Sequence, residues 1–296
     1  GNPVTFAMLT DLWKASKGRF LSAKTLQNYV YEINRHILPY FGERDVRFIK
    51  PYHIEWFVSQ LLEQDYALSS IRYYAGRVPQ ILEVGYINEL IDRNPASKIK
   101  LPKAAKVQKE IIGDEVIDQI NKQANPLVML YLYTGLRRGE GLALMWDGIC
   151  FTSREIQVTK TVSYVKNQAT IKPPKSEAGI RTVPLVEPLH NLLYDLYCQR
   201  ISKYAFPNHA GGMMSLTSFR TFWKNSVKDL GIKIKPHQLR HTYITMLYEA
   251  GIDVKTAQMW AGHSSVGITL EIYTHLRQSL RASQVGKRSL HLISKR

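Results

Sequence analysis

The second half of the chain carries six side chains that could bind or attack a phosphate group. In order along the sequence they are Arg137, Lys175, His237, Arg240, His263 and Tyr273. Taken singly, each has an ordinary structural explanation, because charged side chains usually lie on solvated surfaces and a tyrosine at helical spacing can simply pack in a core. Taken together they favour a phosphate-binding site more strongly. For example, His237 and Arg240 lie three residues apart, so their side chains share a helix face.

The sequence gives little support to other chemistries. It contains no G-x-x-x-x-G-K-[ST] phosphate loop, and the glycines of residues 135–141 do not form the G-x-G-x-x-G pattern of dinucleotide sites. His237 and His241 have the four-residue spacing of a helical zinc site. However, Gln238 replaces the glutamate of H-E-x-x-H and Arg240 adds a positive charge, so we expect neither a metal ion nor a cofactor.

The motifs around these residues resemble the signature of the tyrosine recombinases, the phage integrase family. The resemblance covers residues 113–275 and rests on five motifs in order: Thr-Gly-Leu-Arg-x-x-Glu, a lysine in a β-hairpin ahead of Arg-x-Val-Pro-Leu, His-x-Leu-Arg-His-Thr, Gly-His-Ser-Ser and Tyr-Thr-His. It implies that Tyr273 is the nucleophile and that Lys175 protonates the leaving group. It implies that four side chains contact the scissile phosphate: Arg137, His237, Arg240 and His263. Glu140 corresponds to an acidic position that orients the arginine and histidine side chains.

Elementary chemistry agrees with these roles. A phosphodiester under attack gains negative charge on its non-bridging oxygens, and two guanidinium groups can bind those oxygens in forked geometry without a metal ion. A tyrosine hydroxyl has an ordinary pKa of about 10, so it needs a positive field or a base to attack at neutral pH. The resulting phosphotyrosine keeps the bond energy, so the strands can be rejoined without ATP. The residue set therefore favours strand exchange over hydrolysis.

Residues 1–91 are predicted to be helical and to form a small bundle. Apolar side chains recur at helical spacing after the capping residue Ser22, and a second helix starts at Pro51, a favoured first-turn residue. A third helix begins after Ser70, and Pro79 is expected to kink or shorten it. By the resemblance, this bundle is the DNA-binding domain that the family calls its core-binding domain.

Residues 92–108 change character, because they contain two prolines, five basic residues and weak periodicity. These features are typical of an interdomain linker. A stretch of this length could extend over roughly 55 Å, enough to pass across a DNA duplex. Four of its lysines are predicted to contact DNA: Lys98, Lys100, Lys103 and Lys106.

Residues 109–275 are predicted to form the catalytic domain, mostly helical with a small antiparallel sheet. Segments within residues 154–185 alternate polar with apolar side chains or are β-branched, and turn-like sequences separate them. Lys175 falls in the turn between two of these predicted strands. Glycines mark the expected ends of three later helices: Gly231, Gly251 and Gly262. The predicted fold class is therefore mainly α with a small antiparallel β-sheet, as a helical bundle followed by an α+β domain.

The charge of the chain favours a polyanionic partner. Its 296 residues include 40 Lys and Arg against 24 Asp and Glu, a formal net charge of +16, and the excess is spread along the sequence. A folded basic surface that binds double-stranded DNA is the simplest interpretation. Hydrophobic residues make up 45% of the chain, which is typical of a globular protein. Since no stretch approaches the ~18 apolar residues of a membrane span and two cysteines build no disulfide framework, we expect a cytoplasmic protein without membrane contact.

Within the family, the segments are most similar to integrases of Gram-positive phages and conjugative elements. The resemblance implies integration or excision of a mobile element by a homotetramer on DNA, with accessory DNA-bending or directionality proteins as further partners. A chromosome-dimer resolvase of the same family is the alternative. A type IB topoisomerase-like enzyme, which would not exchange strands between two duplexes, is less favoured, as is an inactive DNA-binding factor.

Both ends of the chain carry expectations of their own. Residues 276–296 are basic with apolar residues spaced through them, which favours a tail that docks on a neighbouring subunit. By the resemblance, a small arm-type DNA-binding domain often precedes the core-binding domain. Either this protein lacks that domain or the chain was trimmed, and the linker-like start, whose first three residues read as a cloning remnant, favours trimming.

Overall fold

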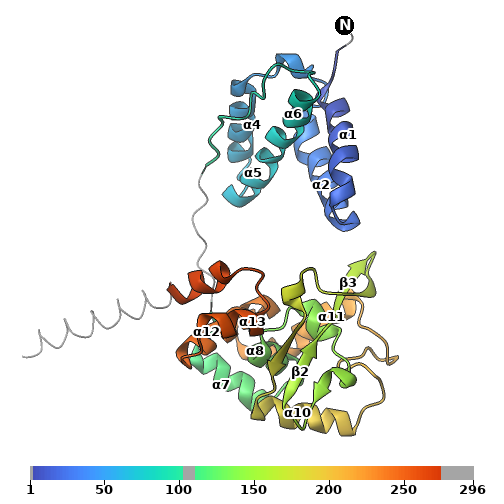
Figure 1. Ribbon diagram of the computed structural model, residues 1–296, viewed down its shortest axis with the longest axis vertical. Helices are drawn as coiled ribbons and strands as arrows, with labels where there is room; N and C mark the ends of the chain where they lie inside the picture. Colours follow the sequence, from blue (N-terminus) through green and yellow to red (C-terminus); the bar gives the residue numbers. More distant parts are fainter. Residues whose placement is uncertain (1–2, 103–110, 275–296) are drawn as a thin grey trace, which may run out of the picture. The chain divides into compact units, whose positions relative to one another are not determined.

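The computed structural model describes residues 3–102 and 111–274 of the chain. They belong to two compact units, Gly1–Val107 and Gln108–Arg296 (Figure 1). Within the described ranges, none of the helices combines the length and the apolar character needed to cross a membrane. Each unit has its own apolar core, so the two are described separately.

The first unit is a bundle of helices. In chain order these are α1 (Phe6–Lys17), α2 (Ala23–Glu32), α3 (Leu38–Phe41), α4 (Pro51–Glu63), α5 (Leu68–Ala75) and α6 (Arg77–Ile87). Side-chain caps start two of them, because the hydroxyl of Thr5 accepts from the backbone of Met8 and that of Ser22 accepts from Thr25. The helices bury a shared apolar core that includes Phe6, Trp13 and Phe57. The helical bundle expected from the periodicity is thus present.

Two of the predicted helices are each divided into two shorter helices in the structure. A π-helical turn over Ile33–Ile37 joins α2 to α3. The third predicted helix breaks at Gly76 into α5 and α6. The break agrees with the expected effect of Pro79, because a proline cannot bond to the carbonyl four residues earlier, which here belongs to Ala75.

The segment predicted to be a linker folds in part onto this bundle. Ala96 is buried, and Ile99 and Leu101 pack against the core of the first unit. The side-chain amide of Asn94 donates to the backbone carbonyl of Pro79 and so fixes the start of the segment. Residues 92–102 are therefore part of the first unit, and residues 103–108 lie outside the described part of the chain.

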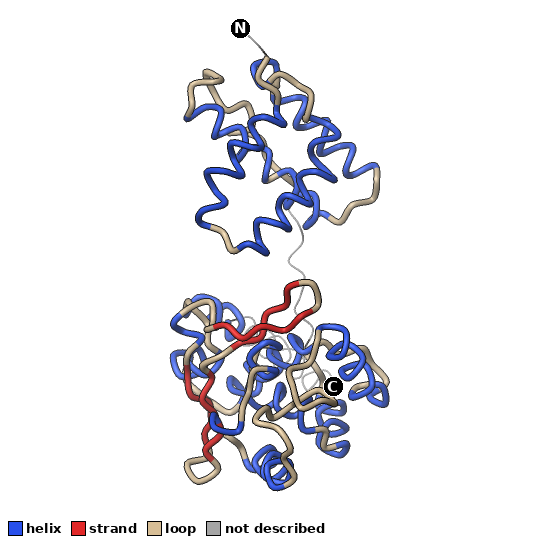
Figure 2. The backbone as a smooth tube through the Cα atoms, turned by 90° about the vertical axis from the view of Figure 1, so that its right-hand side faces the viewer, coloured by secondary structure: helices blue, strands red, loops and turns tan. Residues whose placement is uncertain are grey.

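The second unit combines helices with two small antiparallel sheets, whose strands are drawn in red in Figure 2. One sheet has the order β1-β2-β5 and the other consists of β3 and β4. The strands are β1 (Ile149–Cys150), β2 (Glu155–Val158), β3 (Thr161–Val165), β4 (Gln168–Lys172) and β5 (Arg181–Pro184). In the first sheet Ile156 pairs with Val183, and both side chains are fully buried. The predicted mainly α fold class with a small antiparallel sheet is confirmed.

The helices of the second unit surround α8, whose side chains are almost all buried. They are α7 (Asp114–Gln123), α8 (Pro126–Thr134), α9 (Arg138–Leu142), α10 (Glu187–Cys198), α11 (Leu216–Ser226), α12 (Pro236–Glu249) and α13 (Val254–Ala261). Residues 266–274 form a further helical segment. Because α8 is apolar on every side, it packs against both α10 and α12 as a central helix. This central position brings its C-terminal end close to α12.

Candidate active site

The turn between α8 and α9 places Arg137 at the start of a helix. Gly135 ends α8 with a φ of 60°, in the left-handed region that favours glycine. A Cβ atom at Gly135 would lie 2.3 Å from the Tyr243 ring on α12, so the close approach of these helices also requires glycine. Arg137 then occupies the N-cap position of α9. Its side chain is 43% exposed, which leaves part of the guanidinium accessible to a ligand.

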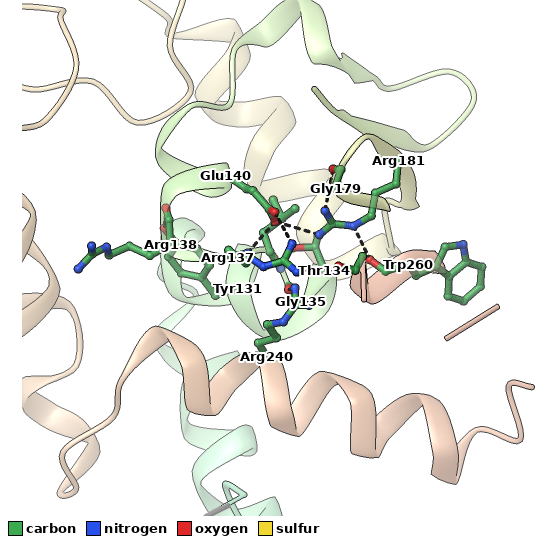
Figure 3. Close-up of polar contacts among 12 residues, drawn as sticks. Tyr131, Thr134, Gly135, Arg137, Arg138, Glu140, Gly179, Arg181, Arg240 and Trp260 are labelled. Carbon is green, nitrogen blue, oxygen red and sulfur yellow. Dashed lines mark hydrogen bonds and ion pairs between the residues drawn. The ribbon is translucent and has the colours of Figure 1, made fainter. Parts of the chain in front are cut away.

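Glu140 is the centre of a buried ion-pair network (Figure 3). Its carboxylate accepts hydrogen bonds from the backbone N–H of Arg137 at 2.8 Å and from the Nη1 of Arg137 at 2.7 Å. A third bond comes from Nη2 of Arg181 on β5, at 3.0 Å. The residue is 4% exposed, so water does not compete for these bonds. Glu140 therefore orients Arg137 directly.

The electrostatics of Glu140 follow from the same contacts. Burial alone would raise its pKa, but the charge and hydrogen bond of Arg181, followed by the hydrogen bonds from Arg137, hold the pKa of Glu140 below its usual value. The carboxylate is consequently ionised at neutral pH and acts as a fixed negative charge between two guanidinium groups.

Arg240 reaches the same region from α12. It is 2% exposed, and its Nη1 donates to the carbonyl oxygen of Gly135 at 2.7 Å. Burial and the neighbouring charge of Arg137 lower its pKa to about 9, so it remains charged at neutral pH. The three guanidinium groups of Arg137, Arg181 and Arg240 thus lie in one region that contains a single carboxylate, which pairs with Arg137 and Arg181. Such a cluster retains an excess of positive charge and favours an anionic ligand.

His263 is tied to this cluster through the residue before it. Gly262 ends α13 in the left-handed region, and its carbonyl oxygen accepts from Nη2 of Arg137 at 2.6 Å. The His263 ring is buried, and its Nδ1 lies 2.8 Å from the hydroxyl of Thr269. His237 lies on the same helix as Arg240, but its side chain is exposed, and its ring packs 4.5 Å from that of His241.

The prediction that Lys175 lies in a β-hairpin is wrong. Strand β4 pairs with β3 and β5 pairs with β2, so the connection between β4 and β5 crosses from one sheet to the other. The hairpin turn falls instead at Lys166 and Asn167, which both have positive φ. The physical reason is that strand pairing depends on which side chains become buried against each other, including side chains far apart in the sequence, and not on the order of the strands along the chain. Lys175 is exposed within this connection.

Tyr273 lies on the helical segment of residues 266–274 and is 6% exposed. Its hydroxyl donates to the carbonyl oxygen of Ile252 at 3.1 Å, and its ring packs edge-on against Tyr248. Burial, with the nearby Asp253 and Tyr248, raises its pKa to about 12. In this state the hydroxyl is protonated and bonded to the loop that joins α12 to α13.

The structure brings together part of the predicted site. Arg137, Glu140 and the backbone at Gly262 are in direct contact, and Arg240 joins them at the end of α8. The segment of Lys175 contacts the cluster through Gly179, which accepts from Arg181, and the segment of Tyr273 does so through Thr269, which bonds to His263. Arg181 is a residue that the sequence reasoning did not select, although it stands in the Arg-x-Val-Pro-Leu motif that was noted.

The remaining predicted residues lie at the end of the first unit or beyond it. Lys98 and Lys100 are both exposed, as a DNA contact requires. Lys103, Lys106 and the tail from residue 275 onwards fall outside the described residues. Within residues 3–102 and 111–274, no three His, Cys, Asp or Glu side chains lie together as a metal site would require.

Known relatives match the chain along most of its length. The ICEBs1 integrase of Bacillus subtilis (strain 168) is 27% identical over 293 residues, covering 92% of this chain and 79% of that protein. A XerC-like tyrosine recombinase of Caldanaerobacter subterraneus is 27% identical over 267 residues, covering 78% of this chain and 68% of that protein.

Solved integrase structures share the fold. The Tn1549 transposon integrase in complex with transposon right end DNA gives a TM-score of 0.79 at 18% identity, over 91% of this chain and 95% of that chain. A lambda integrase tetramer bound to a Holliday junction gives 0.69 at 17% identity, over 92% and 78% of the two chains.

Family profiles agree with the order of the two units. The N-terminal SAM-like domain of phage integrases matches residues 5–62, within the helical bundle. The phage integrase family itself matches residues 108–279, which include the arginine cluster, Lys175 and Tyr273. The sequence motifs, the fold and these matches agree, and the chain belongs to the phage integrase family of tyrosine recombinases.

Proposed function

We propose that this protein is a site-specific DNA recombinase that integrates or excises a mobile element. The observation that carries the proposal is the cluster in which Arg137 and Arg181 pair with the buried carboxylate of Glu140 while the buried guanidinium of Arg240 lies beside them, bonded to the carbonyl of Gly135. Its excess positive charge suits the non-bridging oxygens of a phosphodiester under attack. The likeness to the ICEBs1 integrase supports the assignment to a mobile element.

In the proposed reaction, the oxygen of Tyr273 attacks the scissile phosphorus while the bond from phosphorus to the 5′ oxygen breaks. The phenol proton passes to solvent, and Lys175 supplies a proton to the departing 5′ oxygen. Arg137, Arg240 and the histidines hold the non-bridging oxygens. The DNA is then joined to the protein through a 3′-phosphotyrosyl bond, and its 5′ end carries a free hydroxyl.

Rejoining runs the same steps backwards. The 5′ hydroxyl of a second strand gives its proton to Lys175 and attacks the phosphotyrosine, the bond from phosphorus to the tyrosine oxygen breaks, and the tyrosine oxygen regains a proton from solvent. No net bond energy is lost, so the reaction needs no ATP and no water molecule attacks the phosphorus. Exchange between two duplexes requires four active sites, which supports a homotetramer on double-stranded DNA in the bacterial cytoplasm.

The position of Tyr273 implies a rearrangement before cleavage. Its hydroxyl is bonded to Ile252, and its burial raises its pKa to about 12, whereas attack requires a deprotonated oxygen beside the arginines. We therefore expect DNA binding to break the bond to Ile252 and to move the segment of residues 266–274. The positive cluster would then lower the pKa of the phenol from its raised value.

A nicked suicide substrate tests the proposal. The wild-type protein should become covalently attached to the 3′ phosphate, detected as a slower band on a denaturing gel. Tyr273→Phe removes the attacking oxygen and should bind the same DNA without forming that band. Tyr248→Phe is the matched control, because it alters the neighbouring ring without touching the proposed nucleophile. Attachment that persists in Tyr273→Phe would show that another residue attacks.

A further inference from the structure

Arg181 connects three segments that lie far apart in the sequence. Its side chain is 5% exposed at the start of β5. Its Nε donates to the carbonyl oxygen of Trp260 at 2.7 Å, its Nη1 to that of Gly179 at 3.1 Å, and its Nη2 to the carboxylate of Glu140 at 3.0 Å. Figure 3 shows the guanidinium plane between these three acceptors. Every nitrogen of the group therefore has a protein acceptor.

Two of these acceptors lead to the phosphate-binding residues. Glu140 holds Arg137 by its backbone and its side chain. Trp260 lies in the last turn of α13, just ahead of Gly262 and His263. A Cβ at Gly262 would lie 2.8 Å from Nη1 of Arg181, so the backbone at the end of α13 rests directly on the guanidinium. Arg181 thus fixes the end of α13 against the start of α9.

The third acceptor leads to Lys175. Gly179 closes the short helical turn Glu177–Gly179 that follows Lys175. A Cβ at Gly179 would lie 2.4 Å from the Cβ of Pro174, the residue before Lys175. The two ends of the loop that carries Lys175, at Pro174 and Gly179, are therefore in contact, and Arg181 bonds to the carbonyl oxygen of Gly179 at this contact. Because Lys175 itself is exposed, its position depends on the loop that carries it.

We propose that Arg181 is a positioning residue that sets the loop of Lys175 relative to Arg137 and His263. The inference rests on the proposed role of Lys175 as the general acid. Arginine suits the task because its planar group presents several donors in fixed directions, whereas a lysine ammonium on a flexible stem cannot bridge three acceptors in the same geometry. Arg181 does not touch the reacting atoms, and it acts through the segments it joins.

The leaving group of the DNA provides the test. A substrate with sulfur in place of the bridging 5′ oxygen leaves as a thiolate, which needs no proton because a thiol has a pKa near 8.5. Arg181→Lys in the full-length chain should bind the oxygen substrate normally but cleave it about 10²-fold more slowly, as expected for a displaced acid. The sulfur substrate should restore most of the rate, as it should for Lys175→Ala.

A matched control separates this effect from the loss of any arginine. Arg154 lies beside β2 and is 52% exposed in a surface pair with Glu187. Arg154→Lys should therefore cleave both substrates at the wild-type rate. Arg137→Ala should be slow on both, because its proposed task is to bind the non-bridging oxygens, which the sulfur does not change.

A second variant keeps the test valid if Arg181→Lys does not fold, as judged by thermal unfolding. Gly179→Ala forces the loop away from Pro174 and leaves the pair of Arg181 with Glu140 in place. It should show the same slow cleavage of the oxygen substrate and the same recovery with sulfur. A wild-type rate on the oxygen substrate in either folded variant would overturn the proposal.

The two hypotheses fail in different ways. If Lys175→Ala does not recover with sulfur, the general acid lies elsewhere and the proposed mechanism is wrong at that step. If Lys175→Ala recovers but Arg181→Lys stays slow on both substrates, then Lys175 keeps its role and the positioning role of Arg181 is refuted. Arg181 would then serve the phosphate-binding arginines alone.

Discussion

Replacing the carboxylate of Glu140 should strongly destabilise the second unit. Glu140→Gln keeps the shape of the side chain but removes the one negative charge that lies between Arg137 and Arg181. It also replaces one of the two accepting oxygens by an amide NH2 group, whose donors then face the donors of Arg137 or Arg181. Breaking a buried ion pair from one side typically costs about 3–5 kcal/mol, and the 4% exposure of Glu140 gives no reason to reduce that figure.

Urea unfolding at pH 7 measures this loss. Glu187→Gln is the matched control, because Glu187 also pairs with an arginine but is 61% exposed, where such a pair contributes about 0–1 kcal/mol. We expect the midpoint of Glu140→Gln to fall well below that of the control, with a similar slope against urea.

The pH dependence adds an independent check. Because the folded state lowers the pKa of Glu140, its contribution is fully present above the unfolded pKa near 4.5 and is lost as the pH falls through the lower folded pKa. The difference in the free energy of unfolding between wild type and Glu140→Gln should thus be constant between about pH 6 and 8, where this carboxylate is ionised in both the folded and the unfolded state, and it should shrink in acid. A cost no larger than that of Glu187→Gln, or a difference that grows in acid, would refute the reasoning.

Three further predictions concern the turn between α8 and α9, the role of Arg240 in cleavage, and the salt dependence of DNA binding. Gly135→Ala should lower the free energy of unfolding by on the order of 1–3 kcal/mol, because alanine is strained at this positive φ and its Cβ would clash with the Tyr243 ring. Gly113→Ala is the control and should change the free energy of unfolding little, because open space surrounds Gly113. Equal effects of the two substitutions in urea unfolding would contradict this prediction. Arg240→Lys should bind DNA in a gel-shift assay but cleave a nicked substrate about 10²–10³-fold more slowly. An unchanged rate would show that Arg240 does not hold the non-bridging oxygens. DNA affinity should fall with salt with a log–log slope near −0.9 per phosphate contacted, and a flat response would argue against the basic surface.

Local sequence patterns were enough to predict the fold class and to select candidate residues for the site. Helical periodicity, caps such as Ser22 and the proline at position 51 depend on neighbours within one or two turns, so they can be read without a structure. The same holds for His237 and Arg240, whose spacing puts them on one helix. The order of motifs identified the family, which the comparisons confirm.

The tertiary structure alone decided how these residues are joined. Arg181 is separated by 41 residues from Glu140 and by 79 from Trp260, so no local pattern relates them. Lys175 lies in the connection between the two sheets because β5 pairs with β2 rather than with β4. That pairing buries Ile156 against Val183. Tyr273 is bonded to Ile252 for a similar reason, since its ring completes an apolar cluster with α12 and α13. Hydrogen bonds and burial between distant segments depend on the whole packed unit, whereas sequence periodicity reports only which face of each element is apolar.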